Sequence, residues 1–280
     1  MNKALKITGC LLMGIFPIFR VAASGWPTGK NKFILIPTWY QYYASGYRDL
    51  FSHDYPYPDN GLYRSSLFQL YGEYGLSKRL DFVGSIPYYL IQYRDMVESR
   101  SNKGLGDLEL GLRYNLLNKH DQRYLSIQVS GIVPLYHNDT TELPFIGFGD
   151  AGAEARLMYS GSLKDGKKNW YFNTELAFRE YFDLHGGISQ ISLLATAGLY
   201  LNNSNVISVD ISGMRSNGNN EAFNPINLNG NTNFYFLKGS FDYGHRITKH
   251  VWAYGEVFHD FYDRNTGIGK GFSLMLIYRM

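Results

Sequence analysis

The sequence predicts an all-β protein, a transmembrane antiparallel up-and-down β-barrel of about twelve strands. Three observations lead to this prediction. Apolar residues recur with a period of two along most of the chain, short and long connections alternate, and charged residues gather on one face of each periodic segment. The chain also has 24 tyrosines and 30 glycines but only 18% charged residues, a composition typical of β-rich proteins that meet water and lipid.

The first residues are expected to form a secretory signal peptide. Lys3 and Lys6 give a positive start, and residues 7–19 form an apolar core too short to cross a bilayer. Small residues follow at 21–23 and predict cleavage before Ser24. The expected organisation is a signal peptide at 1–23 and an outer-membrane β-barrel domain at 24–280.

Loss of that signal peptide would remove three basic residues and no acidic residue. The formal charge would fall from +3 to 0, so the pI near 8.7 does not indicate nucleic-acid binding, and no nucleic-acid partner is expected. Cys10, the only cysteine, lies within the expected signal peptide, so we expect neither a disulfide nor thiol chemistry in the barrel.

Residues 124–136 show the strand period clearly. Leu125, Ile127 and Val129 share one face, whereas Ser126 and Gln128 share the other. The segments expected to form strands are, in order, 32–45, 61–76, 80–95, 104–117, 123–137, 149–161, 169–183, 187–202, 204–215, 231–248, 250–263 and 267–280.

The connections alternate in length. The short ones lie near 77–78, 118–122, 162–168, 203 and 249, and the long ones at 46–60, 96–103, 138–148 and 216–230. Short periplasmic turns and long extracellular loops are typical of barrels in the outer membrane of Gram-negative bacteria. An even number of strands places both chain ends on the periplasmic side.

Charge distinguishes the two faces. With the more apolar face of each strand outside, the charged residues expected inside are Glu73, Asp81, Asp107, Glu109, Arg113, Glu154, Arg156, Glu175, Arg179, Asp210, Lys238, Asp242, Arg246, Glu256, Asp260 and Arg279. The charged residues expected outside are Arg64, Arg94, Glu180, Arg215 and Lys270. All five lie near extracellular strand ends, where a charge on the lipid face costs little free energy.

The last strand carries an assembly signal. The alternating residues are Phe272, Leu274, Leu276, Tyr278 and Met280. They resemble the terminal strand signature that the barrel assembly machinery reads, although that signature usually ends in Phe rather than Met. The expected partners are therefore this machinery, outer-membrane lipid and a small-molecule solute.

The stretch "GLGDLELGLRY" at 104–114 does not predict a phosphate loop. Gly104, Gly106 and Gly111 miss the G-x-G-x-x-G spacing, and no helix follows them. Its leucines are expected to face lipid, with Asp107 and Glu109 inside. The glycines are expected to let the strand bend and neighbouring side chains fit.

Two motifs carry a resemblance to a known family. "YGLSKRLDFVGSIPY" at 74–88 and "GLGDLELGLRYNL" at 104–116 resemble the outer-membrane transporters grouped under the meta-pathway of phenol degradation. The matching residues are Tyr74, Gly75, Leu76, Ser77, Leu80, Asp81, Pro87 and Tyr88 in the hairpin, and Gly104, Gly106 and Asp107 in the strand. The resemblance implies uptake or efflux of small, aromatic or apolar organic molecules.

A barrel of this size is expected to hold a polar, solute-conducting lumen. The segment before Lys30 is short, so we expect no plug of the kind found in fatty-acid channels. The residues predicted to line the solute path are Asp107, Glu109, Arg113, Glu154, Arg156, Glu175, Arg179, Lys238, Asp242 and Glu256. The alternative is a non-conducting structural or adhesive barrel whose interior charges form closed salt bridges.

The loop "DLFSHDYPYPDN" at 49–60 is the predicted capture site at the extracellular mouth, through Phe51, Tyr55 and Tyr57. An enzyme is the least favoured alternative. Outer-membrane lipases place His and Ser two residues apart, and none of the seven histidines has that spacing. Asp49 and His53 form a poor match to a protease site, and no catalytic residue, cofactor or metal is predicted.

Overall fold

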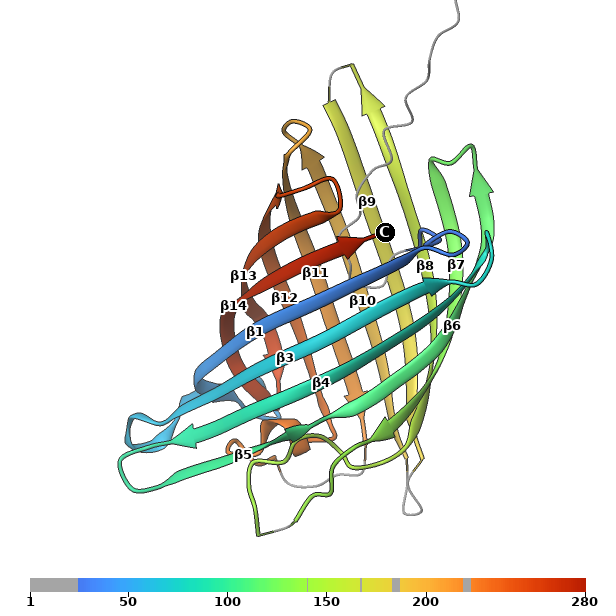
Figure 1. Ribbon diagram of the computed structural model, residues 1–280. Helices are drawn as coiled ribbons and strands as arrows, with labels where there is room; N and C mark the ends of the chain where they lie inside the picture. The colour runs from blue at the N-terminus through green and yellow to red at the C-terminus, as the bar shows by residue number, and fades with distance from the viewer. Residues whose placement is uncertain (1–24, 140, 167, 183–186, 219–222) are drawn as a thin grey trace, which may run out of the picture.

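Antiparallel strands make up nearly all of the protein, whose structure is a computed structural model (Figure 1). It describes residues 25–280 apart from 140, 167, 183–186 and 219–222. The predicted signal peptide therefore lies outside the described residues. Within the described part of the chain, no helix is long and apolar enough to span a membrane.

Fourteen strands and two short 3-10 turns are present among the described residues. The elements are β1 (Phe33–Arg48), β2 (Asp54–Pro56), η1 (Pro58–Asn60), β3 (Leu62–Gly75), β4 (Leu80–Arg94), β5 (Ser99–Leu105), β6 (Asp107–Lys119), β7 (Arg123–Pro134), β8 (Gly152–Asp165), β9 (Lys168–Tyr181), β10 (Ile188–Tyr200), β11 (Asn205–Asn217), η2 (Leu228–Gly230), β12 (Phe234–Arg246), β13 (Val251–Arg264) and β14 (Thr266–Arg279).

The wall closes because the last strand pairs with the first. β14 runs antiparallel to β1, from Arg279 opposite Ile34 to Thr266 opposite Arg48. The other neighbours in the ring follow one another along the chain, so twelve strands form a closed up-and-down barrel, with β2 and β5 as additions. Closure pairs the backbone N–H and C=O groups that an open edge would expose to lipid. This confirms the predicted fold class.

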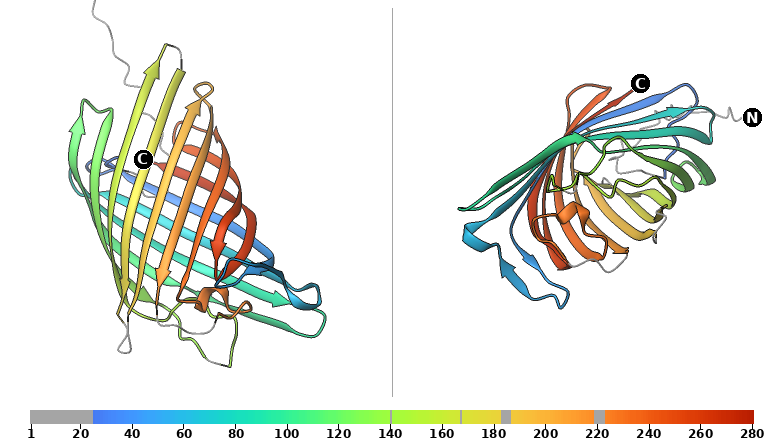
Figure 2. Two further views of the ribbon diagram at one scale, coloured as in Figure 1. Left: turned by 180° about the vertical axis from the view of Figure 1, so that it is seen from behind. Right: turned by 90° about the horizontal axis from the view of Figure 1, so that it is seen from below.

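The two ends of the barrel differ, as the connection lengths predict. The short turns lie at the end that is uppermost in Figure 1, and β1 begins and β14 ends at this same end, where Phe33 N donates to Met280 O at 3.1 Å. The described residues of the long connections 135–151 and 218–233 lie at the opposite end (Figures 1 and 2). The first end is therefore periplasmic and the second extracellular.

The outer face is aliphatic and aromatic. In β6, Leu110 and Leu112 are about half exposed, whereas the intervening Gly111 and the following Arg113 are buried. In β9, Leu176 is 55% exposed beside the buried Glu175. A soluble barrel would bury its leucines and expose its charges, so this reversed pattern identifies a lipid-facing wall.

The outward charges also lie where the sequence predicts them. Arg64, Arg94, Arg215 and Lys270 are exposed, and Glu180 is partly exposed. Each lies toward the extracellular end of its strand. The inward charged residues are buried or half-buried.

The prediction of a long loop at 96–103 is wrong, because residues 99–105 form β5. β5 pairs with β4 from Ser99 opposite Arg94 to Leu105 opposite Tyr88, and β6 then continues along the same neighbour. This part of the sequence is polar on both faces, so it lacks the alternation that marks a strand in lipid. The predicted loop at 46–60 likewise contains β2, which pairs with the end of β1.

Gly106 marks the break between β5 and β6. A Cβ at this position would lie 2.6 Å from the ring of Tyr89, and its N–H donates to Pro87 O at 2.9 Å. A Cβ on Gly111 would lie 2.4 Å from Ser130 Oγ. The glycines of "GLGDLELGLRY" thus permit close packing, as the sequence predicts.

A charge in the middle of the lipid-facing wall should destabilise the barrel strongly. We expect Leu176→Arg, near the middle of β9, to lower the free energy of unfolding by about 2–4 kcal/mol. Leu163→Arg, an equally exposed site beside a periplasmic turn, should cost only about 0–1 kcal/mol. Urea unfolding in lipid vesicles measures both, and equal losses would contradict the assigned membrane depth.

Candidate functional site

The periplasmic end of the barrel is filled by residues 25–29, which precede β1. Thr28 N donates to both carboxylate oxygens of Asp81 at 3.2 Å. The N–H of Gly25 donates to Ser160 Oγ at 2.8 Å, and the Gly25 carbonyl accepts from Ser126 Oγ at 2.6 Å. These partners come from β4, β7 and β8, so the segment is anchored across the interior.

The short segment before Lys30 therefore does occupy the barrel, although the sequence predicts no plug. Five residues are enough because neighbouring inward side chains are large. Trp26 is 5% exposed, and its ring centroid lies 6.4 Å from that of Tyr124. The buried cluster around it consists of Trp26, Ile34, Ile36, Tyr124, Tyr171, Val206, Trp252, Tyr254, Met275 and Ile277, with Tyr71 and Tyr200 against it.

Arg113 ties this segment to the wall. Its Nη2 donates to Thr28 Oγ1 at 3.1 Å and to Asp81 Oδ2 at 3.0 Å, and its Nη1 donates to Glu73 Oε1 at 2.9 Å. All four side chains are buried. An arginine paired in this way satisfies two carboxylates that would otherwise be costly to bury.

A second ion-pair network lies farther along the interior. Glu154 accepts from Arg156 at 2.6 Å and from Arg179 at 2.8 Å. Arg156 also pairs with Glu175 at 3.1 Å, and Arg179 with Glu109 at 3.1 Å. These predicted lumen charges therefore pair with one another.

Three inward carboxylates meet on β11, β12 and β13. One oxygen from each of Asp210, Asp242 and Glu256 lies within 4.8 Å of the others. Each carboxylate accepts a hydrogen bond from a serine hydroxyl. Ser240 donates to Asp210 at 3.0 Å and Ser208 to Asp242 at 3.1 Å, and Ser273 of β14 donates to Glu256. Each of the three carboxylates is therefore hydrogen-bonded to a serine of the barrel wall.

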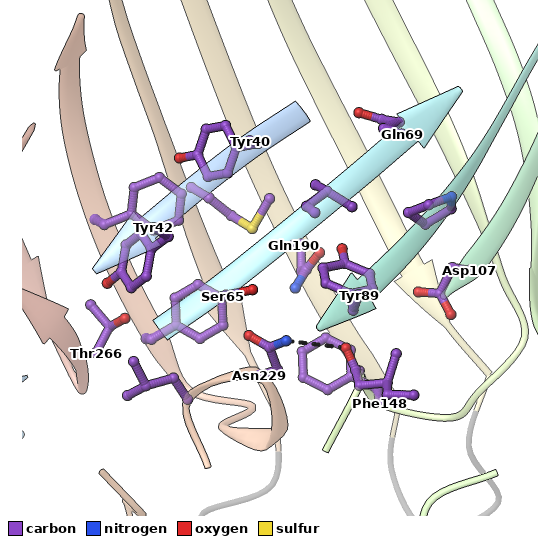
Figure 3. Close-up of a pocket in the computed structure, with 18 of the residues that line it drawn as sticks. Tyr40, Tyr42, Ser65, Gln69, Tyr89, Asp107, Phe148, Gln190, Asn229 and Thr266 are labelled. Carbon is purple, nitrogen blue, oxygen red and sulfur yellow. Dashed lines mark hydrogen bonds between the residues drawn. The ribbon is translucent and has the colours of Figure 1, made fainter. Parts of the chain in front are cut away.

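A cavity of about 490 Å³ lies on the extracellular side of the ion pairs (Figure 3). Tyr40 and Tyr42 of β1 and Tyr89 of β4 project into it, facing Gln190 of β10. The lining combines aromatic rings with a few polar and charged groups. Its other members include Tyr63, Gln69, Asp107, Glu109, Ile132, Tyr136, Phe148, Arg179, Tyr181, Met214, Leu228, Asn229, Phe234, Phe236, Lys238 and Asp260.

Two extracellular loops meet over this cavity. Phe145 N donates to Asn227 Oδ1 at 2.7 Å, and Asn229 Nδ2 donates to Ile146 O at 3.2 Å. Seen from below, both loops lie across the end of the barrel (Figure 2). The cavity is thus bounded by loops outside and by packed side chains toward the periplasm.

The structure separates the ten predicted lumen residues into groups. Four of them line the cavity: Asp107, Glu109, Arg179 and Lys238. The others lie inside the wall but away from the cavity lining, namely Arg113, Glu154, Arg156, Glu175, Asp242 and Glu256.

Asp107 and Lys238, two of the predicted lumen residues that line the cavity, differ from the other two in having no salt bridge among the described residues. Asp107 Oδ2 accepts from the Tyr181 hydroxyl at 3.4 Å, while its Oδ1 is buried and has no hydrogen-bond partner among the described residues. The Lys238 ammonium lies 5.4 Å from the ring centroid of Tyr40 and 5.0 Å from that of Phe258. Cation–π contact stabilises such a charge against an aromatic wall.

The predicted capture residues do not reach the cavity. Phe51 is 75% exposed and Tyr55 is 43% exposed, whereas Tyr57 is buried and packs edge-on against Tyr93 at 5.4 Å. Burial raises the pKa of the Tyr57 hydroxyl, which donates to Pro225 O at 2.9 Å. Tyr57 thus fastens two loops together, and none of the three residues lines the cavity.

The aromatic lining of the cavity was not among the residues predicted from the sequence. Tyr40, Tyr42 and Tyr89 all have inward parity in their strands, and that parity was the available signal. The predicted lumen residues were chosen by their charge, so these inward tyrosines were left out. The loop residues Ile146, Phe148 and Asn229 gave no such signal, because their positions depend on how two long loops fold.

Asp49 and His53, the residues compared with a protease site, do not line the cavity. His53 Nδ1 lies 3.6 Å from Asp49 Oδ2 in an exposed loop, and Asp54 pairs with Arg48 at 2.6 Å. Slight burial opposes ionisation of Asp49, but backbone donors from His53 and Phe51 outweigh it and hold the Asp49 pKa below its usual range. Hydrogen bonds within the loop account for this arrangement.

Comparison with known proteins places the fold. No family model matches the sequence, and no curated protein matches it. The structure is similar to the COG4313 outer membrane channel from Pseudomonas putida F1, with 12% identity, a TM-score of 0.69, and coverage of 95% of this chain and 98% of that one. It is also similar to the NanC porin, with 9% identity, a TM-score of 0.51, and coverage of 88% and 99%.

These likenesses show the fold. The chain is an outer-membrane β-barrel, which confirms both the fold class and the bacterial outer-membrane location that the sequence predicts. The fold also agrees with the resemblance to outer-membrane transporters.

Loss of the Arg113 guanidinium should destabilise the barrel more than loss of a surface arginine. Arg113→Met leaves Glu73 and Asp81 buried without their counter-charge, which we expect to lower the free energy of unfolding by about 3–5 kcal/mol. Arg123→Met, at an exposed turn, should change it by about 0.5 kcal/mol or less. Urea unfolding in vesicles measures both, and similar midpoints would refute a stabilising role for the network.

Proposed function

We propose that this protein is an outer-membrane channel that passes small organic molecules with an apolar or aromatic part. The cavity of about 490 Å³ in the extracellular half carries this proposal. A soluble guest of that size would lie against tyrosine and phenylalanine rings, and the few polar groups would orient it. The similarity in fold to a channel and a porin supports a transport role.

Three groups support recognition rather than simple passage. The buried Asp107 Oδ1 can accept a hydrogen bond from a guest, and Gln190 and Asn229 offer amide donors and acceptors. Tyr40 and Tyr42 present flat rings along one side. A guest that carries both a ring and a hydroxyl group fits this combination best.

Passage to the periplasm requires residues 25–29 to move. The cavity lies beyond Arg113, Thr28 and Trp26, which close the periplasmic end in the described conformation. The hydrogen bonds of Thr28 with Asp81, Glu73 and Arg113 fix the segment, and Trp26 packs within the buried cluster of inward side chains. Residues 25–29 therefore act as the gate of the proposed channel.

A non-conducting structural barrel is the second candidate. It is favoured by the closed ion pairs of Glu154 with Arg156 and Arg179, and by the packed cluster around Trp252. In such a barrel these contacts would only stabilise the fold. The two candidates differ in whether loosening the segment at 25–29 opens a path.

Removal of the Trp26 side chain should open the channel. Truncation of a buried tryptophan costs about 3–5 kcal/mol of packing, so we expect Trp26→Ala to raise the open fraction in planar bilayers by about tenfold or more. Trp39→Ala is the matched control, because Trp39 stacks on Phe68 on the outer face. Single-channel conductance and flux of a small phenol into vesicles report the change.

The outcomes separate the two candidates. A rise in conductance and flux for Trp26→Ala alone supports the channel. If neither variant conducts, although both fold as judged by heat-modifiable mobility in SDS gels, the structural barrel is correct.

A further inference from the structure

Basic residues surround a tyrosine on the outer face of β14, β1 and β3. Tyr43 lies directly opposite Arg64 on one side and Lys270 on the other. The Arg64 guanidinium lies 5.5 Å from the ring centroid of Tyr43. Arg94 is opposite Leu62, the next outward residue of β3, so it lies on a diagonal about 7–8 Å from Arg64.

The same arrangement recurs on β11, β12 and β13. Tyr235 lies directly opposite Arg215 and Arg264, and the Arg264 guanidinium lies 5.1 Å from its ring centroid. Tyr262, which is 54% exposed, stacks on Tyr235 at 5.2 Å. Two tyrosines at the extracellular ends of their strands thus each lie between two cations.

These outward cations have no acidic partner. Among the described residues, no carboxylate lies within 4.0 Å of Arg64, Arg94, Arg215, Arg264 or Lys270. Three inward arginines, by contrast, pair with carboxylates: Arg113, Arg156 and Arg179. The residues opposite Arg64 and Lys270 are Gln92 and His259, neither of which carries a carboxylate.

Apolar residues lie next to the cations, on the periplasmic side along the same strands. Phe68 and Leu70 follow Arg64 on β3, and Leu274 follows Lys270 on β14, all of them about half exposed. On β11, Ile211 lies beyond Arg215 in the same direction and is 53% exposed. Each outer surface therefore presents positive charge beside a hydrocarbon-binding face.

From this arrangement we propose that the two basic surfaces, Arg64–Tyr43–Lys270 with Arg94 and Arg215–Tyr235–Arg264, bind the phosphate groups of the anionic glycolipid in the outer leaflet. Guanidinium and ammonium groups donate to phosphate oxygens, while the acyl chains lie along the apolar residues beside them. The tyrosines hold the guanidinium groups over their rings and sit at headgroup depth. The uncompensated positive charge is complementary to such a lipid and to no group in the described wall.

The test uses lipopolysaccharide as the probe and the delipidated full-length barrel in a non-ionic detergent. We expect R64Q/R215Q/K270Q to bind lipopolysaccharide about tenfold or more weakly than the wild type at low salt. The matched control is K78Q/R123Q/K164Q, which removes the same charge from exposed residues in or beside periplasmic turns and should bind as the wild type does. Native mass spectrometry or microscale thermophoresis measures binding.

Two further arms identify the lipid chemistry. Dephosphorylated lipopolysaccharide should bind the wild type as weakly as the intact lipid binds the triple variant, and inorganic phosphate alone should not protect the barrel from heat. Equal binding of dephosphorylated lipid, equal loss in the control variant, or unchanged binding in R64Q/R215Q/K270Q would each overturn the proposal. Heat-modifiable mobility in SDS gels confirms that every variant is folded.

Discussion

The pairing of β14 with β1 is the constraint on which the rest of the structure depends. Within lipid a sheet must satisfy its backbone groups internally, so the wall has to close on itself. Closure gives every strand an inside and an outside, and the period of two then assigns each side chain to lipid or lumen. Leucines therefore face outward and carboxylates inward, because that choice is the only one that avoids burying charge in hydrocarbon.

Charge confined to the interior has to be neutralised there. The barrel does this with arginines shared between carboxylates, as Arg113 is between Glu73 and Asp81, and Arg179 between Glu109 and Glu154. Such networks fill space as well as balance charge. The free volume lies next to the extracellular loops, where aromatic rings share the lining with the Glu109–Arg179 ion pair.

Alternation predicted the strands of the barrel because lipid imposes it on every transmembrane segment. It failed for β5, since residues 99–103 are polar on both faces and show no alternation. It also could not place residues 25–29, whose partners Asp81, Ser126 and Ser160 are distant in sequence. Alternation could not predict the cavity for the same reason. Phe148 and Asn229 reach the cavity from two loops, and the fold of each loop depends on contacts with the other.

The anchoring of residues 25–29 bears on the order in which the barrel is assembled. These residues leave the ribosome before any strand, yet their partners lie on β4, β7 and β8. A Cβ on Gly75, the last residue of β3, would lie 1.8 Å from Gly29 O, so the segment passes this strand end at a distance that only glycine permits. The contacts that hold residues 25–29 can therefore form only when β4, β7 and β8 have come together, so closure of the periplasmic end depends on strands made well after the segment itself.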